Sequence, residues 1–164
     1  MPTRSLIGIL SDDGRSYRAR YCHSDGYPTH MLPVLGEALH KHHAGDLAPL
    51  AAALLRHDWA YLAPGSAADE AHDGGQRSDR LQPTAGVGFH YAGSRELEPI
   101  NGTLDEDAGG SATWLYLISG DEIRVHYETG GAWAHFGDYG SAELAHLDPT
   151  DLIARESAVT GRRV

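Results

Sequence analysis

Hydrophobic and polar residues alternate over several short stretches of the chain, which is the pattern of β-hairpins. Residues 4–10 form a mostly apolar run, an Asp-Gly pair then favours a tight turn, and residues 16–21 alternate strictly. A second hairpin is predicted over residues 112–127, and residues 132–136 are expected to add a third strand to it.

Between the hairpins the periodicity changes to that of helices. The apolar spacing predicts a helix over Leu35–His43, which Gly45 ends. Asp46 is a suitable cap for a second helix, which is expected to run to about His57. Residues 23–33 contain a glycine and two prolines, so they are expected to be irregular.

These elements predict an α+β fold, with an antiparallel sheet of about five to six strands and the helix pair on one face. A hairpin by itself is only marginally stable, so both hairpins are expected to share one sheet. The length of 164 residues predicts a single domain, 1–164. Residues 64–83 and 93–111 are expected to be long acidic loops, and 157–164 a frayed tail after a short helix over 149–156.

The formal net charge of −10 is unevenly distributed along the chain. Residues 66–110 hold nine acidic and three basic residues, whereas residues 1–65 hold six of each. A field of this sign argues against binding of nucleic-acid phosphates over a broad surface, because those phosphates need basic partners. A small basic pocket within the acidic body is still compatible with this composition.

The cysteine count and the apolar runs bear on the compartment. Cys22 is the one cysteine, so no disulfide can form within the chain, which is typical of a reducing compartment. The first apolar run is too short for a signal peptide, and no run approaches the roughly 18 apolar residues of a membrane span. We therefore expect a cytoplasmic protein without membrane contact.

Candidate chemistry is sparse over most of the chain. Cys22 and His23 are neighbours on a predicted strand, so their side chains point to opposite faces, and Cys22 is expected to be a small buried residue. His40, His42 and His43 lie at a predicted helix end without a zinc-binding spacing. No complete phosphate-binding glycine motif is present. Neither a metal nor a cofactor is predicted.

The segment from Tyr21 to Pro28 is the densest in candidate binding residues. It leaves a strand and turns before a helix, an arrangement in which rigid elements hold exposed polar groups. His23 and Asp25 would share one face of an extended chain, and Tyr27 would add flat apolar surface with a polar tip. The competing interpretation is a turn in which Asp25 caps the loop and Tyr27 packs.

Three stretches near the N-terminus carry a resemblance: residues 3–8 (Thr-Arg-Ser-Leu-Ile-Gly), an Asp-Gly turn, and residues 21–28 (Tyr-Cys-His-Ser-Asp-Gly-Tyr-Pro). The chain resembles a group of small uncharacterised proteins of tailed phages and actinobacteria, which carry Thr-Arg-Ser-x-Ile-Gly, Asp-Gly and Tyr-Cys-His-Trp-Asp-Gly-Tyr-Pro at these places. Ser24 stands where that group usually has Trp. The resemblance implies an accessory protein of the cytoplasm, or of the host cytoplasm if phage-encoded, and no particular reaction.

The function predicted from the sequence is a binding module for a small anionic ligand or a host protein, with counter-defence among the roles considered. Two alternatives stay open. One is a hydrolase or transferase that uses His23 with Asp25, and the other is an acidic mimic whose carboxylates between 69 and 107 occupy a nucleic-acid-binding surface of a partner. We expect a binder rather than an enzyme, and the sequence indicates no oligomeric state. The expected ligand contacts are Arg4, Arg18, Arg20, His23, Asp25 and Tyr27.

Overall fold

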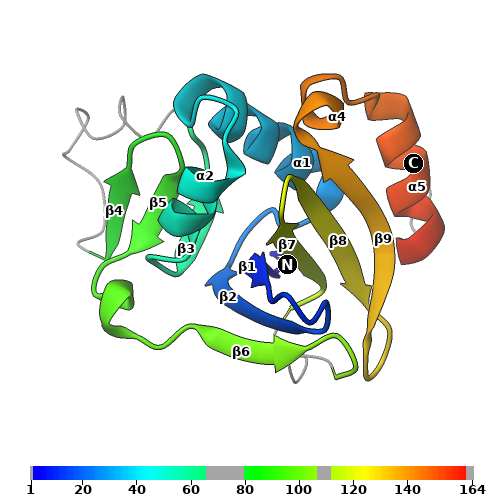
Figure 1. Ribbon diagram of the computed structural model, residues 1–164, viewed down its shortest axis with the longest axis horizontal. Helices are drawn as coiled ribbons and strands as arrows, with labels where there is room; N and C mark the ends of the chain where they lie inside the picture. Colours follow the sequence, from blue (N-terminus) through cyan, green and yellow to red (C-terminus); the bar gives the residue numbers. More distant parts are fainter. Residues whose placement is uncertain (1, 66–79, 107–111, 162–164) are drawn as a thin grey trace.

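One mixed sheet organises the computed structural model, which describes residues 2–65, 80–106 and 112–161. The strands of this part run in the order β4, β5, β3, β2, β1, β7, β8 and β9, and β6 pairs with β2 off this path, which makes nine strands (Figure 1). Their bounds are β1 Ser5–Leu10, β2 Ser16–Cys22, β3 Trp59–Leu62, β4 Leu81–Thr84, β5 Gly88–Tyr91, β6 Ile100–Thr103, β7 Trp114–Ser119, β8 Glu122–Glu128 and β9 Trp133–Gly140.

Both predicted hairpins are confirmed, and they belong to one sheet. In the first, β1 and β2 pair antiparallel with Gly8 opposite Ala19. In the second, β7 and β8 pair antiparallel with Tyr116 opposite Val125. β9 adds the predicted third strand to the second hairpin. Short turns with positive-φ glycines set these registers, which is why the sequence pattern alone located them.

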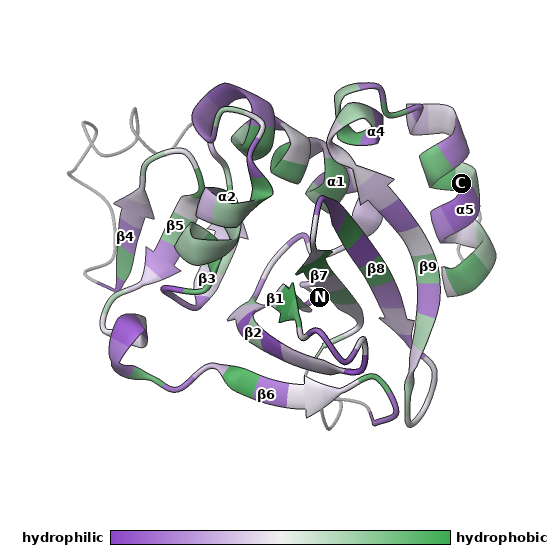
Figure 2. Ribbon diagram, in the orientation of Figure 1, coloured by the Kyte–Doolittle hydropathy of each residue, from purple (hydrophilic) through white to green (hydrophobic). Residues whose placement is uncertain are grey.

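The expectation of a purely antiparallel sheet of five to six strands is wrong. β1 pairs with β7 in parallel, and so does β2 with β3 through Cys22 and Trp59. Each hairpin has an internal turn that forces antiparallel pairing, but nothing local dictates how two distant hairpins join. The parallel β1–β7 contact buries the two most apolar strands side by side at the centre of the sheet, as the colouring in Figure 2 shows.

Two of the extra strands lie where long loops were expected. β4 occupies the end of the 64–83 segment, and β6 lies within 93–111 and pairs with β2. Neither strand shows strong alternation of apolar and polar residues. Each is stabilised mainly by backbone hydrogen bonds to a neighbouring strand and not by a hydrophobic face of its own. Residues 66–79 and 107–111 lie outside the described part of the chain.

The helices cover one face, at the top and right of Figure 1. The prediction that residues 23–33 are irregular is wrong from Pro28 onward, because Pro28 opens α1 at a position where the missing N–H costs nothing. α5 continues through Thr160, four residues past its predicted end and into the expected tail. No helix among the described residues is long and apolar enough to cross a membrane. The helical bounds are α1 Pro28–Glu37, the π-helical turn η1 Ala38–His42, α2 Leu47–Leu54, the 3-10 turn η2 Ser94–Glu96, α4 Ser141–Ala145 and α5 Pro149–Thr160.

The sheet separates two hydrophobic cores. The larger lies under the helices and includes Leu35, Leu50 and Trp114. The smaller lies on the opposite face and includes Leu6, Leu115 and Trp133. Proteins commonly bury one sheet face under helices, but here β6 and its continuation cover the second face as well.

A short chain of backbone hydrogen bonds closes the strands around the smaller core. The N–H of Leu104, just after β6, donates to the carbonyl of Arg15 at 2.9 Å, and the N–H of Trp133 donates to the carbonyl of Leu104 at 3.1 Å. Trp133 begins β9, at the far edge of the sheet from β2. The sheet therefore curls until the end of β6 meets the start of β9, as the lower part of Figure 1 shows.

We predict that Gly8→Ala destabilises the protein by about 3 kcal/mol or more, because overpacking of a rigid core has costs of this order. A β-carbon at Gly8 would lie 1.9 Å from the carbonyl oxygen of Arg18, inside the β1–β2 pair. Gly140→Ala is the matched control, since its β-carbon would meet nothing closer than 3.5 Å. Urea unfolding measures both variants, and equal stability of the two would contradict the prediction.

Candidate functional site

Three residues near the ends of β1 and β2 meet at the molecular surface. The Tyr21 hydroxyl and His23 Nδ1 lie 2.8 Å apart, within hydrogen-bond distance. The Arg4 guanidinium reaches the same hydroxyl: burial raises the pKa of Tyr21, and the charge and hydrogen bonding of Arg4 act in the opposite direction. Arg4 and His23 therefore both interact with one phenol oxygen, and we call these three residues the Arg4–His23 rim.

Through Tyr21, the one rim residue that lines it, this rim adjoins a shallow hollow of about 510 Å³. Tyr21 forms one wall, and Tyr91 and Leu97 are among the residues that form the rest. Leu97 is 58% exposed, the most exposed large hydrophobic side chain in the described part of the chain. Burial raises the pKa of Tyr91, and so does the charge of Tyr21. The hollow thus combines two tyrosines with an exposed leucine.

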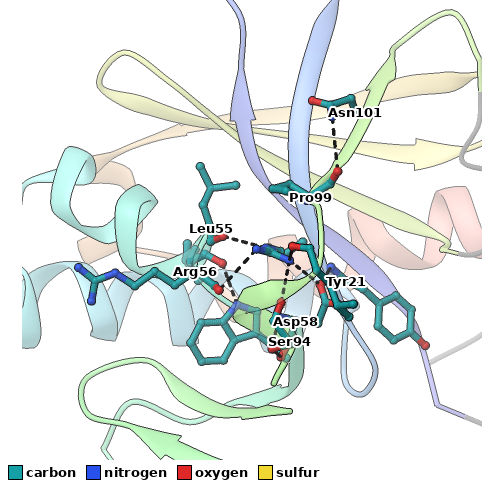
Figure 3. A network of polar contacts seen from close by, with 11 residues as sticks. Tyr21, Leu55, Arg56, Asp58, Ser94, Pro99 and Asn101 are labelled. Atoms are coloured by element: carbon teal, nitrogen blue, oxygen red, sulfur yellow. Dashed lines mark hydrogen bonds and ion pairs between the residues drawn. The ribbon is translucent and has the colours of Figure 1, made fainter. Parts of the chain in front are cut away.

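Arg20 is a structural residue and not part of an open binding edge. Arg20 is only 3% exposed. Its guanidinium donates to backbone carbonyls of two distant segments, one at the end of α2 and one around η2 (Figure 3). Nε donates to Leu55 O at 2.8 Å, and Nη1 donates to Leu97 O at 2.8 Å and to Ser94 O at 3.2 Å. The end of α2 and the η2 segment are thereby tied to β2, so the sequence-based expectation that Arg20 contacts a ligand is replaced by this role.

Asp58 completes the floor of the hollow next to Arg20. Its Oδ1 lies 3.8 Å from Arg20 Nη1 and accepts a hydrogen bond from the Tyr21 N–H at 3.3 Å. The Asp58 N–H donates to Ser94 Oγ at 3.0 Å. The negative charge of Asp58 is therefore balanced by Arg20. The Asp58 carboxylate holds Tyr21 in place, and the Asp58 main chain holds Ser94 of the η2 segment.

Arg18 lies apart from the rim, although it precedes Arg20 by two residues on β2. Its side chain is exposed and lines a separate groove with Ile9 and Asn101. The two arginines expected to form one edge thus have different surroundings. Alternation correctly placed them on one side of the strand, but the loops that cover Arg20 and leave Arg18 exposed come from distant parts of the chain.

The backbone at Asp25 separates it from His23. Asp25 has φ +57°, so the chain turns there, and the extended geometry on which a shared face depended is absent. His23 pairs with Tyr21 instead, and its N–H donates to Trp59 O at 2.9 Å. Since the turn directs Asp25 into solvent, the structure supplies no carboxylate–imidazole pair from these two residues for hydrolysis or transfer.

Gly26 is required for packing and not for a positive φ. A β-carbon there would lie 2.8 Å from both Ser5 Cβ and Thr3 O. The Gly26 N–H donates to Thr3 O at 2.8 Å, and its carbonyl accepts from the buried Tyr116 hydroxyl at 2.7 Å. Tyr27 follows as the residue that caps α1, and it faces a different cavity from the hollow.

Cys22 and the helix-end histidines have structural surroundings. Cys22 is fully buried, as predicted, and burial raises the pKa of its thiol to about 12. His40 Nε2 contacts Ser141 O, and His43 Nδ1 contacts Ala38 O, both at 2.8 Å. Among the described residues, no three histidine, cysteine or acidic side chains gather in a way that could hold a metal ion.

Sequence reasoning missed the residues that make the hollow. Leu97 lies in the segment 93–111 that was expected to be an acidic loop, and no sequence pattern singled out Tyr91 or Asp58. Leu97 between two glutamates was the one available signal, because an isolated large apolar residue in an acidic loop needs a reason to be there. Its proximity to Tyr21 depends on the Arg20 hydrogen bonds, which no local pattern reveals.

Two pairs of histidine rings each contain a ring whose pKa is lowered. His57 and His90 stack with ring centroids 3.7 Å apart, and burial together with the charge of His90 lowers the pKa of His57 to about 4. His126 lies 5.6 Å from His135, centroid to centroid, and burial lowers the pKa of His126 to about 4.

We predict that Arg20→Met lowers the free energy of unfolding by about 3 kcal/mol, because it leaves buried carbonyls and the Asp58 carboxylate without a partner. Arg18→Met is the matched control on the same strand, and we expect it to change stability by less than about 1 kcal/mol. Urea denaturation measures both. A stable Arg20→Met variant would show that the buried network is dispensable.

The histidine pairs predict a loss of stability as the pH falls from about 6.5 to about 4. Over this range the unfolded chain binds protons at His57 and His126 and the folded protein does not, so acid favours unfolding. His57→Gln should make the stability less dependent on pH over this window, whereas His146→Gln, at an exposed residue, should leave the dependence unchanged. Urea midpoints measured across the window decide, and parallel pH profiles for wild type and His57→Gln would refute the prediction.

Comparison with known proteins returned no match. No family of known proteins matches this chain, and neither does any curated protein or solved structure. The chemistry of the site is therefore inferred from its own residues.

Proposed function

We propose that the protein is a binding module and that its ligand is an anion attached to an apolar or aromatic group. The observation that carries this proposal is the Arg4–His23 rim beside the hollow of Tyr21, Tyr91 and Leu97. A small anionic molecule or an anionic group on a host protein has this chemistry. Both are the partner classes expected from the sequence.

The rim supplies donors for the anion. Arg4 is exposed and carries a guanidinium with several N–H donors in a planar fork, which suits carboxylate and phosphate oxygens. Tyr21 engages Nδ1 of His23, so Nε2 is the ring nitrogen that contacts the ligand. The Tyr21 hydroxyl interacts with both Arg4 and His23 and so restricts their movement. Such preorganisation lowers the entropic cost of binding.

The hollow supplies surface for the apolar part of the ligand. Tyrosine rings offer large apolar area with little conformational freedom to lose, and an exposed leucine beside them gains from being covered. Asp58 is the acidic residue that lines the hollow, and Arg20 already balances its charge at 3.8 Å. An anion at the rim therefore meets the exposed guanidinium of Arg4, while the carboxylate of Asp58 is already paired with Arg20.

The proposal predicts that phenyl phosphate binds more tightly than inorganic phosphate, because only the former covers Tyr91 and Leu97. Titration followed by amide NMR should shift resonances of residues 21–23 and 91–97. Arg4→Gln should weaken binding about tenfold, the size of one lost charge-assisted hydrogen bond.

Arg18→Gln is the matched control, since it removes the same charge from an exposed arginine outside the rim. We expect it to change the affinity less than twofold, in line with the weak effect of distant, screened charges. If both variants weakened phenyl phosphate binding equally, the effect of Arg4→Gln would come from the overall charge of the protein and not from the rim. Shifts confined to other parts of the chain would move the site away from the hollow.

A further inference from the structure

A second cavity lies on the helix side of the sheet, away from the hollow. It measures about 360 Å³, and its lining joins the N-terminal segment, the start of α1, the start of β7, the end of β8 and the C-terminal part of α5. Thr3 and Tyr27 line it from the first part of the chain, and Tyr127 and Glu128 from β8. We call this cavity the α5 crevice. Its volume is within the range of small-ligand sites.

The charge of the α5 crevice is opposite to that of the rim. Glu128 and Glu156 line it, and no lysine or arginine of the described residues does. Both carboxylates are held in position by hydrogen bonds. Glu156 accepts from the N–H of Thr29 at 2.9 Å and from the Thr29 hydroxyl at 3.1 Å, and Glu128 accepts from the N–H of Gly130. These bonds involve Oε1 of each glutamate, and the Thr29 hydroxyl also lies 3.4 Å from Oε2 of Glu156. Oε2 of Glu128 is therefore the atom that we expect a ligand to contact first.

Aromatic rings form much of the remaining wall. Tyr27 and Tyr127 are half-buried, and Trp114 is almost fully buried and packs against Tyr127 with ring centroids 6.1 Å apart. The faces of such rings attract cations, because their π-electrons carry negative charge. Val159 and Thr160 from α5 border the same space. Carboxylates and aromatic faces around one cavity are the chemistry that recognises an organic cation.

We propose that the α5 crevice binds an alkylammonium or guanidinium group. The group is either that of a free amine or the side chain of a lysine or arginine on another protein. The chain of the ligand lies along Tyr27 and Tyr127, and its charged end meets Glu128 and Glu156. This site is independent of the anion site proposed above, since the two share no lining residue.

Titration with agmatine, which carries both cationic groups, tests the proposal by amide NMR and calorimetry. A blocked peptide with one arginine between glycines distinguishes a protein source from a free amine, and butanol serves as the uncharged comparison. We expect agmatine to shift resonances of residues 127–128 and 159–160, and butanol to leave them unshifted. Binding of the peptide as well assigns the crevice to a protein partner, and binding of agmatine alone assigns it to free amines.

Glu128→Gln should weaken agmatine binding about tenfold, equivalent to one lost charged contact. Glu122→Gln is the matched control, because Glu122 lies on the same strand, pairs with Arg124 and is outside the crevice. Tyr127→Leu keeps an apolar side chain but removes the aromatic face, and it should weaken binding as well. The proposal is overturned if neither agmatine nor the peptide binds at millimolar concentration, or if Glu122→Gln weakens binding as much as Glu128→Gln.

Discussion

The rest of this fold depends on the burial of β1 between two hydrophobic cores. Its side chains alternate between the helix-covered core and the core enclosed by β6, and its backbone is paired on both edges, with β2 and with β7. A strand in this position has to satisfy all its backbone donors and acceptors within the protein, because water cannot reach them. Gly8 shows how tightly the strand fits, since the carbonyl of Arg18 occupies the place of its missing β-carbon. Both hairpins, and through them both candidate sites, are positioned from this strand.

Arg20 fixes the position of segments outside the sheet, as β1 does for the strands. A buried guanidinium is costly unless its donors are paired, and here carbonyls at the end of α2 and around η2 pair them. The consequence is that residues from three distant parts of the chain meet around one side chain. Leu97 is exposed beside Tyr21 and Tyr91 because its own carbonyl is held by Arg20. The arginine that resembles a ligand contact in the sequence is therefore the residue that builds the hollow.

Two neighbouring residues just before β1 contribute to the two different proposed sites. Thr3 lines the α5 crevice, whereas Arg4 reaches the Tyr21 hydroxyl. Successive residues of an extended chain point to opposite sides, so one short segment contributes to a cation site and to an anion site. The protein has a net charge of −10, and the long-range field of that charge favours the approach of cationic partners. The anion site depends instead on the local charge of Arg4.

The sequence alone was sufficient for features that depend on short-range geometry. The two hairpins, the third strand of the second hairpin and the burial of Cys22 follow from alternation, turn residues and caps, which act over a few residues. The presence of two successive helical segments between the hairpins follows in the same way, although the first begins at Pro28 and the second ends at Leu54. The position of His23 directly after a strand also followed, because the turn and proline signals that end the strand are local.

Only the tertiary structure decided the parallel joining of the hairpins, the pairing of β6 with β2, and the different roles of Arg18 and Arg20. Each of these depends on contacts between residues tens of positions apart, and local patterns carry no information about which distant segment supplies the partner. The same holds for the partner of His23. The left-handed turn at Asp25 removed the expected carboxylate, and the adjacent strand residue Tyr21 took its place.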